Sequence, residues 1–269
     1  MEWRDEGLVI GVRRHGEHSA ILEAMTRAHG RCLGLVRGGR SAKLSAALQP
    51  GNTLCLVWRA RLDEHLGAFS VEPLMLRAGA LMQSALALAG VHWLGALMRL
   101  LPERDPHEAV YDALTVIAER LGDAALAPPL IARFEAQMLS ECGFRLDLSR
   151  CAATGTRERL VYVSPKTGRA LSAEAGAPWR DRLLPLPPFL REGAPVEAEP
   201  SAGEIADGFR TTGHFLAREL FAARGEPLPD SRRAFLKAAA SARKPRRNQR
   251  SGGAEPVSGI DGAGASRPG

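Results

Sequence analysis

The first 73 residues alternate short apolar runs with glycine, proline and charged residues. The last of these runs, 66–72, changes side-chain face from one residue to the next. Apolar runs of this length, bounded by turn residues, are typical of β-strands. The predicted strands cover residues 7–12, 19–26, 32–36, 53–58 and 66–72.

A single helix interrupts these predicted strands. Ser41 is a favourable N-cap for a helix over residues 42–48, and Pro50-Gly51 closes it. Five strands with one helix between the third and the fourth are the element order of an OB-fold barrel. We therefore expect a five-stranded OB-fold nucleic-acid-binding domain over residues 1–76.

From Leu74 the apolar period changes from two to 3.6 residues, which favours helices. Asp105 as cap, Pro106 and Glu108 give three agreeing signals for a helix start, and Ser201 begins a capping box. The predicted helices cover residues 74–101 (as two helices or one bent helix), 105–121, 128–139 and 205–223, and a last one, capped by Asp230 or Ser231, extends to about residue 240. We expect an all-α helical domain over residues 77–240.

Two segments depart from the helical pattern. Residues 142–179 are irregular with one strand-like piece, 160–163, and predict an insert within the helical domain. Residues 241–269 are rich in Gly, Pro, Ser and Arg and have almost no large apolar side chain. Because such a segment cannot bury enough surface to offset its ordering entropy, we expect a disordered basic tail.

The stretch 78–98 has no charged residue over 21 positions, which is long enough to span a bilayer. Gln83, Ser84 and His92 interrupt it, and no aromatic belt or flanking basic cluster accompanies it. A buried bundle helix is the simpler interpretation, and a membrane span is the alternative.

The composition is that of a globular protein, with 45% of the 269 residues apolar and 25% charged. Four cysteines are too few for a disulfide scaffold. The charged start Met1–Glu6 does not fit a signal peptide. We expect a cytoplasmic protein with reduced thiols.

The formal charge of +6 is distributed unevenly. Up to Ser231 the chain has 27 Lys and Arg against 28 Asp and Glu, whereas from Arg232 onward it has 9 against 2. Within the first part, residues 24–62 hold seven basic residues and no acidic one. Such a stretch creates a local positive field in a nearly neutral body.

Residues suited to catalysis or metal binding are scattered. The glycine-containing stretch 38–43 lacks the G-x-x-x-x-G-K-[ST] spacing of a phosphate loop. Cys142 and Cys151 are separated by eight intervening residues with no later pair, and two thiols do not complete a tetrahedral zinc site. We expect no enzymatic activity, no metal and no cofactor.

The acid-free stretch indicates a nucleic-acid surface, because single strands bind OB-folds through backbone electrostatics and base stacking. Aromatic residues are few in the first 73, namely Trp3, Trp58 and Phe69, and we expect at least one in the core. Binding should therefore be electrostatic and independent of base sequence. The candidate DNA-binding residues are Arg13, Arg14, Arg27, Arg31, Arg37, Arg40, Lys43, Arg59 and Arg61.

Two alternatives use the same charges. A solvated basic face needs no ligand. An RNA-binding or ribosome-associated protein would use the same OB-fold barrel, and comparing affinities for DNA and RNA strands of equal length separates that alternative from DNA binding.

Short blocks along the chain resemble the RecO family of DNA repair proteins, in the same order and from about Met1 to Ala240. The blocks are 3–10, 17–22, 26–30, 35–39, 48–52, 58–62, 101–104, 111–112, 142–148, 162–170 and 183–187.

This resemblance implies an N-terminal OB-fold, a helical second domain and an embedded zinc-finger-like insert. It implies a non-enzymatic recombination mediator that binds single- and double-stranded DNA and anneals complementary strands. The implied partners are RecR, the acidic C-terminal tail of single-strand-binding protein and, indirectly, RecA, which is loaded on DNA coated by that protein. Such a protein acts in the cytoplasm, at the nucleoid.

Some members of the family hold zinc with four cysteines. Here Cys151 stands at a position that matches that motif, Thr154 replaces the second ligand, and Ala and Ser occupy 170–175 in place of the second pair. We therefore expect the insert over 142–179 to lack its zinc ligands and to be held by its own hairpin.

Overall fold

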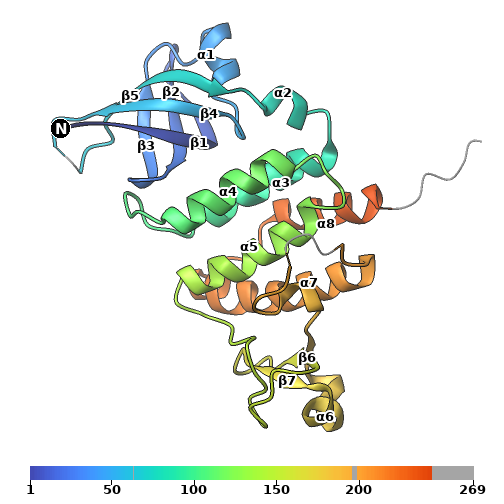
Figure 1. Cartoon of the computed structure of the whole chain (residues 1–269). Coiled ribbons are helices and arrows are strands. Elements are labelled where there is room, and N and C mark those ends of the chain that lie inside the picture. Colours follow the sequence, from blue (N-terminus) through green and yellow to red (C-terminus); the bar gives the residue numbers. More distant parts are fainter. Residues whose placement is uncertain (63, 196–198, 244–269) are drawn as a thin grey trace, which may run out of the picture.

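The computed structural model describes residues 1–62, 64–195 and 199–243. The chain forms three layers along one axis (Figure 1): a β-barrel at one end, helices in the middle and a small β-insert at the other end. This is the predicted α+β fold, an N-terminal five-stranded barrel followed by a helical domain with an embedded insert. Most of the predicted tail, from residue 244, lies outside the described residues, and its first residues belong to the last helix.

The barrel has the predicted OB-fold order of elements. Its strands are β1 (Glu2–His15), β2 (Ser19–Thr26), β3 (Gly30–Val36), β4 (Thr53–Arg59) and β5 (Ala68–Met75), with helix α1 (Ala42–Ala47) between β3 and β4. The first half of β1 pairs with β4 and its second half with β2, and a bulge between Val9 and Gly11 marks the change of partner. One long strand therefore closes the barrel.

Two predicted strands, the first and the fifth, have the wrong boundaries. β1 is longer at both ends than the predicted 7–12, because Arg4 and Glu6 are exposed on a strand whose other face is covered. β5 extends to Met75, so Leu74 and Met75 belong to the barrel and not to the predicted helix over 74–101. Near the C-terminal ends of both strands the side chains are exposed on both faces, so the sequence there does not alternate between apolar and polar residues.

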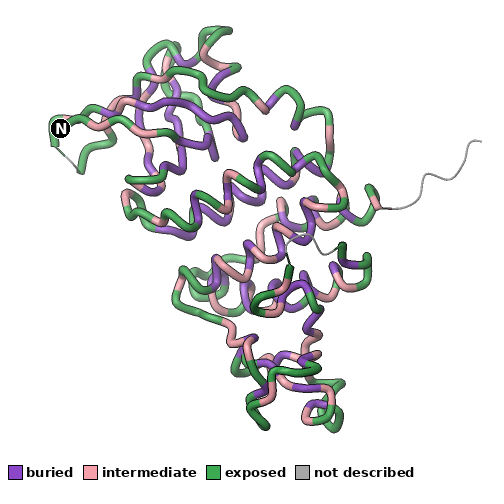
Figure 2. The backbone as a smooth tube through the Cα atoms, in the orientation of Figure 1, coloured by how far each residue is buried: buried purple, intermediate pink, exposed green. Residues whose placement is uncertain are grey.

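The barrel closes around an apolar core in which Leu22, Leu54 and Leu56 are fully buried and Trp58 is 1% exposed. Gly67 has a positive φ of 68°, and a Cβ there would lie 2.3 Å from the Trp58 indole nitrogen. Glycine is therefore required where the chain turns over this ring. Figure 2 shows the buried positions concentrated on the barrel strands and on the inner faces of the helices.

Helices form the middle layer of the described chain. They are α2 (Ala78–Leu81), α3 (Ala85–Met98), α4 (Glu108–Arg120), α5 (Ala127–Glu141), α7 (Ala202–Phe215), prolonged by the π-helical turn Leu216–Phe221 and the 3-10 turn Ala222–Arg224, and α8 (Asp230–Ala242). The capping box of Ser201 and Glu204 is confirmed. The predicted caps at α4 and α8 are wrong, since neither helix has a side-chain N-cap hydrogen bond and their N-cap residues are His107 and Pro229.

The uncharged stretch 78–98 divides into α2 and α3, because Ser84 adopts an extended conformation and caps α3. Its apolar side chains, including Trp93 and Leu94, are buried in the helical core. Among the described residues, no helix has both the length and the apolar character needed to cross a bilayer.

A buried ion pair fixes α8 against the other helices. The guanidinium of Arg232 donates to both carboxylate oxygens of Glu135 at 2.9 Å, and Glu135 is fully buried. Glu135 also accepts hydrogen bonds from the Trp93 indole N–H at 2.8 Å and from the Thr212 hydroxyl. Four elements, α3, α5, α7 and α8, therefore meet at one carboxylate.

The insert is a small sheet with helical turns. It contains β6 (Leu160–Val163), β7 (Ala170–Ser172), α6 (Ala173–Gly176), the 3-10 turns Ala177–Arg182 and Pro188–Leu190, and β8 (Leu184–Pro185). The strand order is β7-β6-β8, so the sheet extends beyond the predicted 142–179 and returns the chain to the helical layer. The predicted strand over 160–163 is confirmed as β6.

Candidate nucleic-acid interface

Five of the nine predicted DNA-binding residues lie together at one end of the barrel. Adjacent strands bring them into line, because Arg14 lies opposite Ala20, and Ala20 lies opposite Val36. Helix α1 lies on the side of the barrel away from α3 and α4 (Figure 1). We call these five residues the loop cluster: Arg13 and Arg14 at the end of β1, Arg37 and Arg40 after β3, and Lys43 in α1.

Arg40 joins the two loops that carry this cluster. Its backbone N–H donates to the carbonyl of His18 at 3.2 Å. Its guanidinium donates to the carbonyls of Gly16 and Glu17 at 3.1 and 2.6 Å. These bonds fix the loop between β3 and α1 against the turn between β1 and β2, and the other four cations lie on or beside these two segments.

Those four cations are exposed and form no ion pair within the described residues. The acidic residue of the turn, Glu17, lies 3.8 Å from His18 and not against an arginine. Guanidinium and ammonium groups without carboxylate partners remain available to bind phosphate groups. The loop cluster is therefore an exposed cationic surface supported by a rigid barrel.

Arg27 and Arg31 are placed differently, at the junction of the barrel and the helices. Arg27 lies 2.9 Å from Asp112 of α4. Arg31, whose side chain is only 13% exposed, lies 2.9 Å from Glu23 and donates to the carbonyl of Leu101 at 3.1 Å. These contacts join the two domains, and they leave the Arg31 guanidinium little access to a phosphate group.

Arg59 and Arg61 lie at the end of β4, next to the N-terminus. The guanidinium of Arg59 donates to Glu2 at 2.8 Å, and this hydrogen bond lowers the pKa of Glu2 and raises that of Arg59. Arg61 is exposed. The nine predicted residues therefore form one cluster of five, a domain junction of two and a separate pair.

The aromatic residues of the barrel are not exposed. Trp3 is half-buried and stacks on His29, with ring centroids 4.1 Å apart, and on Trp58 at 5.7 Å. Trp58 and Phe69 are buried in the barrel core, as predicted for at least one of the three. The barrel therefore offers charge to a polynucleotide without an exposed ring for base stacking.

The thiol of Cys151 is held by hydrogen bonds from its own loop and from β7. Burial raises its pKa, but hydrogen bonds from the Thr154 side chain and from the backbone N–H groups of Ser172, Ala153 and Thr154 outweigh burial and lower the pKa to about 6. Within the described ranges, no three or more His, Cys, Asp and Glu side chains form a group that could hold a metal ion.

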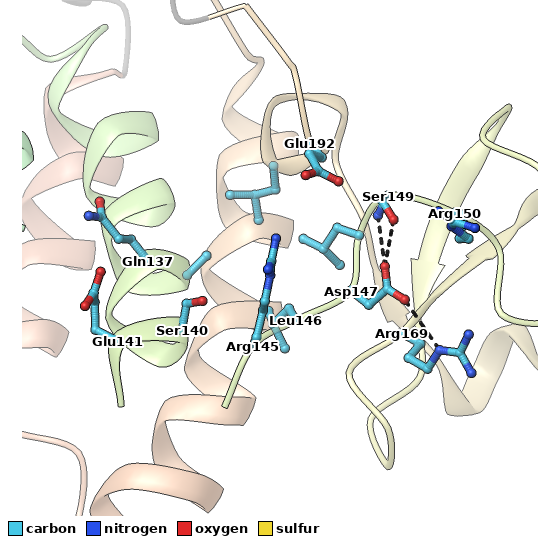
Figure 3. A pocket seen from close by; sticks show the side chains of 13 residues that line it. Gln137, Ser140, Glu141, Arg145, Leu146, Asp147, Ser149, Arg150, Arg169 and Glu192 are labelled. Atoms are coloured by element: carbon cyan, nitrogen blue, oxygen red, sulfur yellow. Dashed lines mark hydrogen bonds and ion pairs between the residues drawn. The ribbon is translucent and has the colours of Figure 1, made fainter. Parts of the chain in front are cut away.

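A groove of about 920 Å³ separates α5 from the insert (Figure 3). Asp147 accepts a hydrogen bond from the Ser149 hydroxyl at 2.8 Å and lies 3.6 Å from Arg169. These contacts, with Ser149 first, lower the pKa of Asp147. The charged groups of this groove are mixed in sign, and it is not a continuation of the loop cluster.

The exposed ring of Trp179 was not predicted from the sequence. Trp179, in the turn Ala177–Arg182, is 57% exposed, and the Arg182 guanidinium carbon lies 6.0 Å from its ring centroid. The only signal in the sequence is the run Pro178-Trp179-Arg180-Asp181-Arg182, in which a tryptophan stands between proline and charged residues.

Comparisons with known proteins cover most of the chain. Residues 1–75 match the family described as "Recombination protein O N terminal", and residues 82–226 match "Recombination protein O C terminal". The chain is 61% identical over 236 residues to the DNA repair protein RecO of Methylocella silvestris, covering 88% of this chain and 95% of that protein. It is 58% identical over 238 residues to the RecO of Mesorhizobium japonicum, covering 88% and 93%. The RecO of Beijerinckia indica is 57% identical over 236 residues, covering 88% and 94%.

Proposed function

Since this chain belongs to the RecO family of DNA repair proteins, we propose that it is a recombination mediator that binds single- and double-stranded DNA and anneals complementary strands. The observation that carries the proposal is the loop cluster, whose exposed cations have no carboxylate partner within the described residues. Its barrel is of the type that binds single strands. The proposed activity makes or breaks no covalent bond.

Binding by this surface follows from counterion release. Each phosphate neutralised on a single strand contributes about −0.7 to the slope of log affinity against log salt. Four exposed cations held by the two loops that Arg40 joins provide such contacts without reading base edges. The expected binding is therefore strongly salt-dependent and independent of sequence.

Annealing follows from the same chemistry. Neutralising phosphates on two strands reduces their mutual repulsion. Since the exposed cations of the loop cluster contact phosphates, this surface leaves the base edges of a bound strand free to pair with a complement. A surface that binds backbone and spares bases suits strand pairing.

We further propose that the protein acts in the cytoplasm, at the nucleoid, with RecR to load RecA on DNA coated by single-strand-binding protein. The acidic C-terminal tail of that protein would suit an apolar groove of about 590 Å³ between α7 and α8. Ile205, Phe209 and Leu236 line it, and Arg210 and Arg243 supply charge. Ala206→Glu, an exposed change in this groove, should weaken binding of a labelled tail peptide.

The deciding experiment is annealing of complementary strands pre-coated with single-strand-binding protein. The full chain should accelerate duplex formation, and RecR together with the chain should permit RecA filaments on the coated strand. A chain that binds bare DNA but leaves coated strands unpaired would contradict the mediator proposal.

RNA or ribosome binding is the second candidate, because the loop cluster reads phosphates and not the sugar. Equal-length DNA and RNA strands in one competition titration distinguish the two. A clear preference for RNA would favour the second candidate.

A further inference from the structure

We propose that the insert carries a second binding surface for single-stranded DNA, centred on Trp179 with Arg180 and Arg182 beside it. The inference rests on the proposed DNA binding, and it adds a site that the loop cluster does not contain. The turn Ala177–Arg182 that carries these residues is here called the Trp179 turn.

Trp179 is more exposed than the other three tryptophans of the described residues. The indole is 57% exposed, whereas Trp58 and Trp93 are buried and Trp3 is half-buried against other rings. Large aromatic rings left in water are typical of interaction surfaces.

The Trp179 turn is held in place. Ser172 caps the short helix α6 just before it, and a Cβ at Gly176 would lie only 2.4 Å from the Tyr162 ring of β6, so α6 packs closely on the sheet. Pro178 fixes one backbone angle within the turn. The backbone that leads into the turn is therefore fixed against the sheet, which lowers the conformational entropy that the turn loses when it binds a ligand.

Charge beside the ring favours a polynucleotide. The Arg182 guanidinium carbon lies 6.0 Å from the centroid of the Trp179 ring, and the Arg180 side chain is 72% exposed. Asp181 lies 3.7 Å from Arg180 but is 92% exposed, so solvent screens this pair. Across residues 142–187 there are eight Lys and Arg against four Asp and Glu.

A nucleic-acid base fits this combination better than an acidic peptide does. A base presents a flat face that stacks on a single indole, while its flanking phosphates meet cations on either side. Recognition of an acidic peptide would use the cations but would leave the exposed indole face unexplained.

The proposed second surface lies far from the loop cluster. The insert lies at the opposite end of the molecule from α1 and the barrel (Figure 1). With one surface at each end, a single protein can bind two strands at once. This raises the effective concentration of each strand near its complement.

The test is photocrosslinking of the full chain to oligothymidylate that carries one 5-iodouracil, followed by mapping of the crosslinked peptide. We expect crosslinks at Trp179 in the parent and in the chain with Arg37→Glu and Lys43→Glu. In that altered background, Trp179→Ala should lower affinity by about fivefold to a hundredfold, the range for one stacked base. Trp179→Phe should retain most of the affinity.

The outcomes are distinguishable. Crosslinks confined to the barrel, with Trp179→Ala binding like its parent, would overturn the second surface and leave the proposed function standing. Loss of binding in Trp179→Ala, with no effect of Arg37→Glu and Lys43→Glu, would support the second surface and contradict the barrel surface. Quenching of Trp179 fluorescence by an acidic peptide but not by oligothymidylate would also overturn it.

Discussion

The barrel end of the molecule carries exposed cations and keeps its aromatic rings covered, whereas the insert end exposes Trp179 beside Arg182. Binding through phosphates weakens steeply as salt rises, whereas base stacking depends on salt far less. The two ends should therefore hold a strand by different forces and respond differently to ionic strength.

Between these ends lies the helical layer, which keeps them apart (Figure 1). The Glu135 carboxylate ties its helices together with two hydrogen bonds from Arg232 and one from Trp93. The layer that separates the two ends therefore contains a buried charge that is stable only while it is paired.

The largest expected effect is therefore that of Arg232→Ala. It leaves the Glu135 carboxylate buried without its cation, which should lower the free energy of unfolding by about 3–5 kcal/mol. Urea denaturation measures the change. The matched control is Arg233→Ala, the exposed neighbour, which should stay within about 0.5 kcal/mol of the parent. Equal losses in both variants would show that the ion pair does not stabilise the layer.

Next in size is charge reversal at the barrel end by Arg37→Glu and Lys43→Glu. Removing two phosphate contacts should reduce the salt slope for single-stranded DNA by about 1.4 and weaken binding at low salt by at least about tenfold. A fluorescence anisotropy titration at several salt concentrations measures both.

The control for this reversal is the double variant Arg120→Glu and Lys237→Glu, which changes net charge equally on exposed helix positions. If the control weakened binding as much as the barrel variant, the effect would belong to net charge and not to the loop cluster. Arg40 is left intact in both, because it holds the loops together.

A smaller effect is expected for Arg31→Ala at the domain junction. Loss of the hydrogen bonds to Glu23 and Leu101 should lower the free energy of unfolding by about 1.5–3 kcal/mol. The salt slope of DNA binding should stay that of the parent, because the Arg31 side chain is 13% exposed. If Arg31→Ala reduced the salt slope of DNA binding and left the free energy of unfolding unchanged, Arg31 would belong to the DNA-binding surface.

Arg31 also shows where inference from the sequence ends. The barrel was predictable because its strands alternate or run apolar between turns, and the Ser201 capping box because its partners lie three residues apart. The stretch 24–62 has no acidic residue in the sequence, but in space Glu103 and Asp112 meet Arg31 and Arg27. Pairing across distant segments is set by the tertiary fold.

The exposed platform of the insert could not be predicted for a related reason. The exposure of Trp179 is set by how the turn that follows α6 lies in the folded insert, and the sequence pattern around it does not specify that position. The full length of β1 was likewise not predictable, because the ends that pair with β4 and β2 carry exposed polar side chains.

The smallest expected effect concerns the hydrogen bonds around Cys151 in the insert. The barrel, by contrast, is stabilised by an apolar core. Thr154→Val removes the hydroxyl that favours the thiolate of Cys151. The pKa of Cys151 should rise from about 6 toward its ordinary value, by less than about one pH unit, since one hydrogen bond contributes about 1 kcal/mol. Ultraviolet absorbance of the thiolate against pH measures the shift.

The sign of the linked stability follows from the same pKa. Because the folded Cys151 has a lower pKa than an unfolded thiol, deprotonation adds stability that is complete above the ordinary pKa and is lost as pH falls through about 6. Thr154→Val should lose that stability at a higher pH than the parent, and Cys151→Ser should lack it at every pH. Cys32, whose pKa burial raises to about 12, stays protonated in this pH range and adds no thiolate absorbance to the titration. If the pKa of Cys151 were the same in Thr154→Val as in the parent, the backbone N–H groups alone would lower it, and the Thr154 hydroxyl would have no part in stabilising the thiolate.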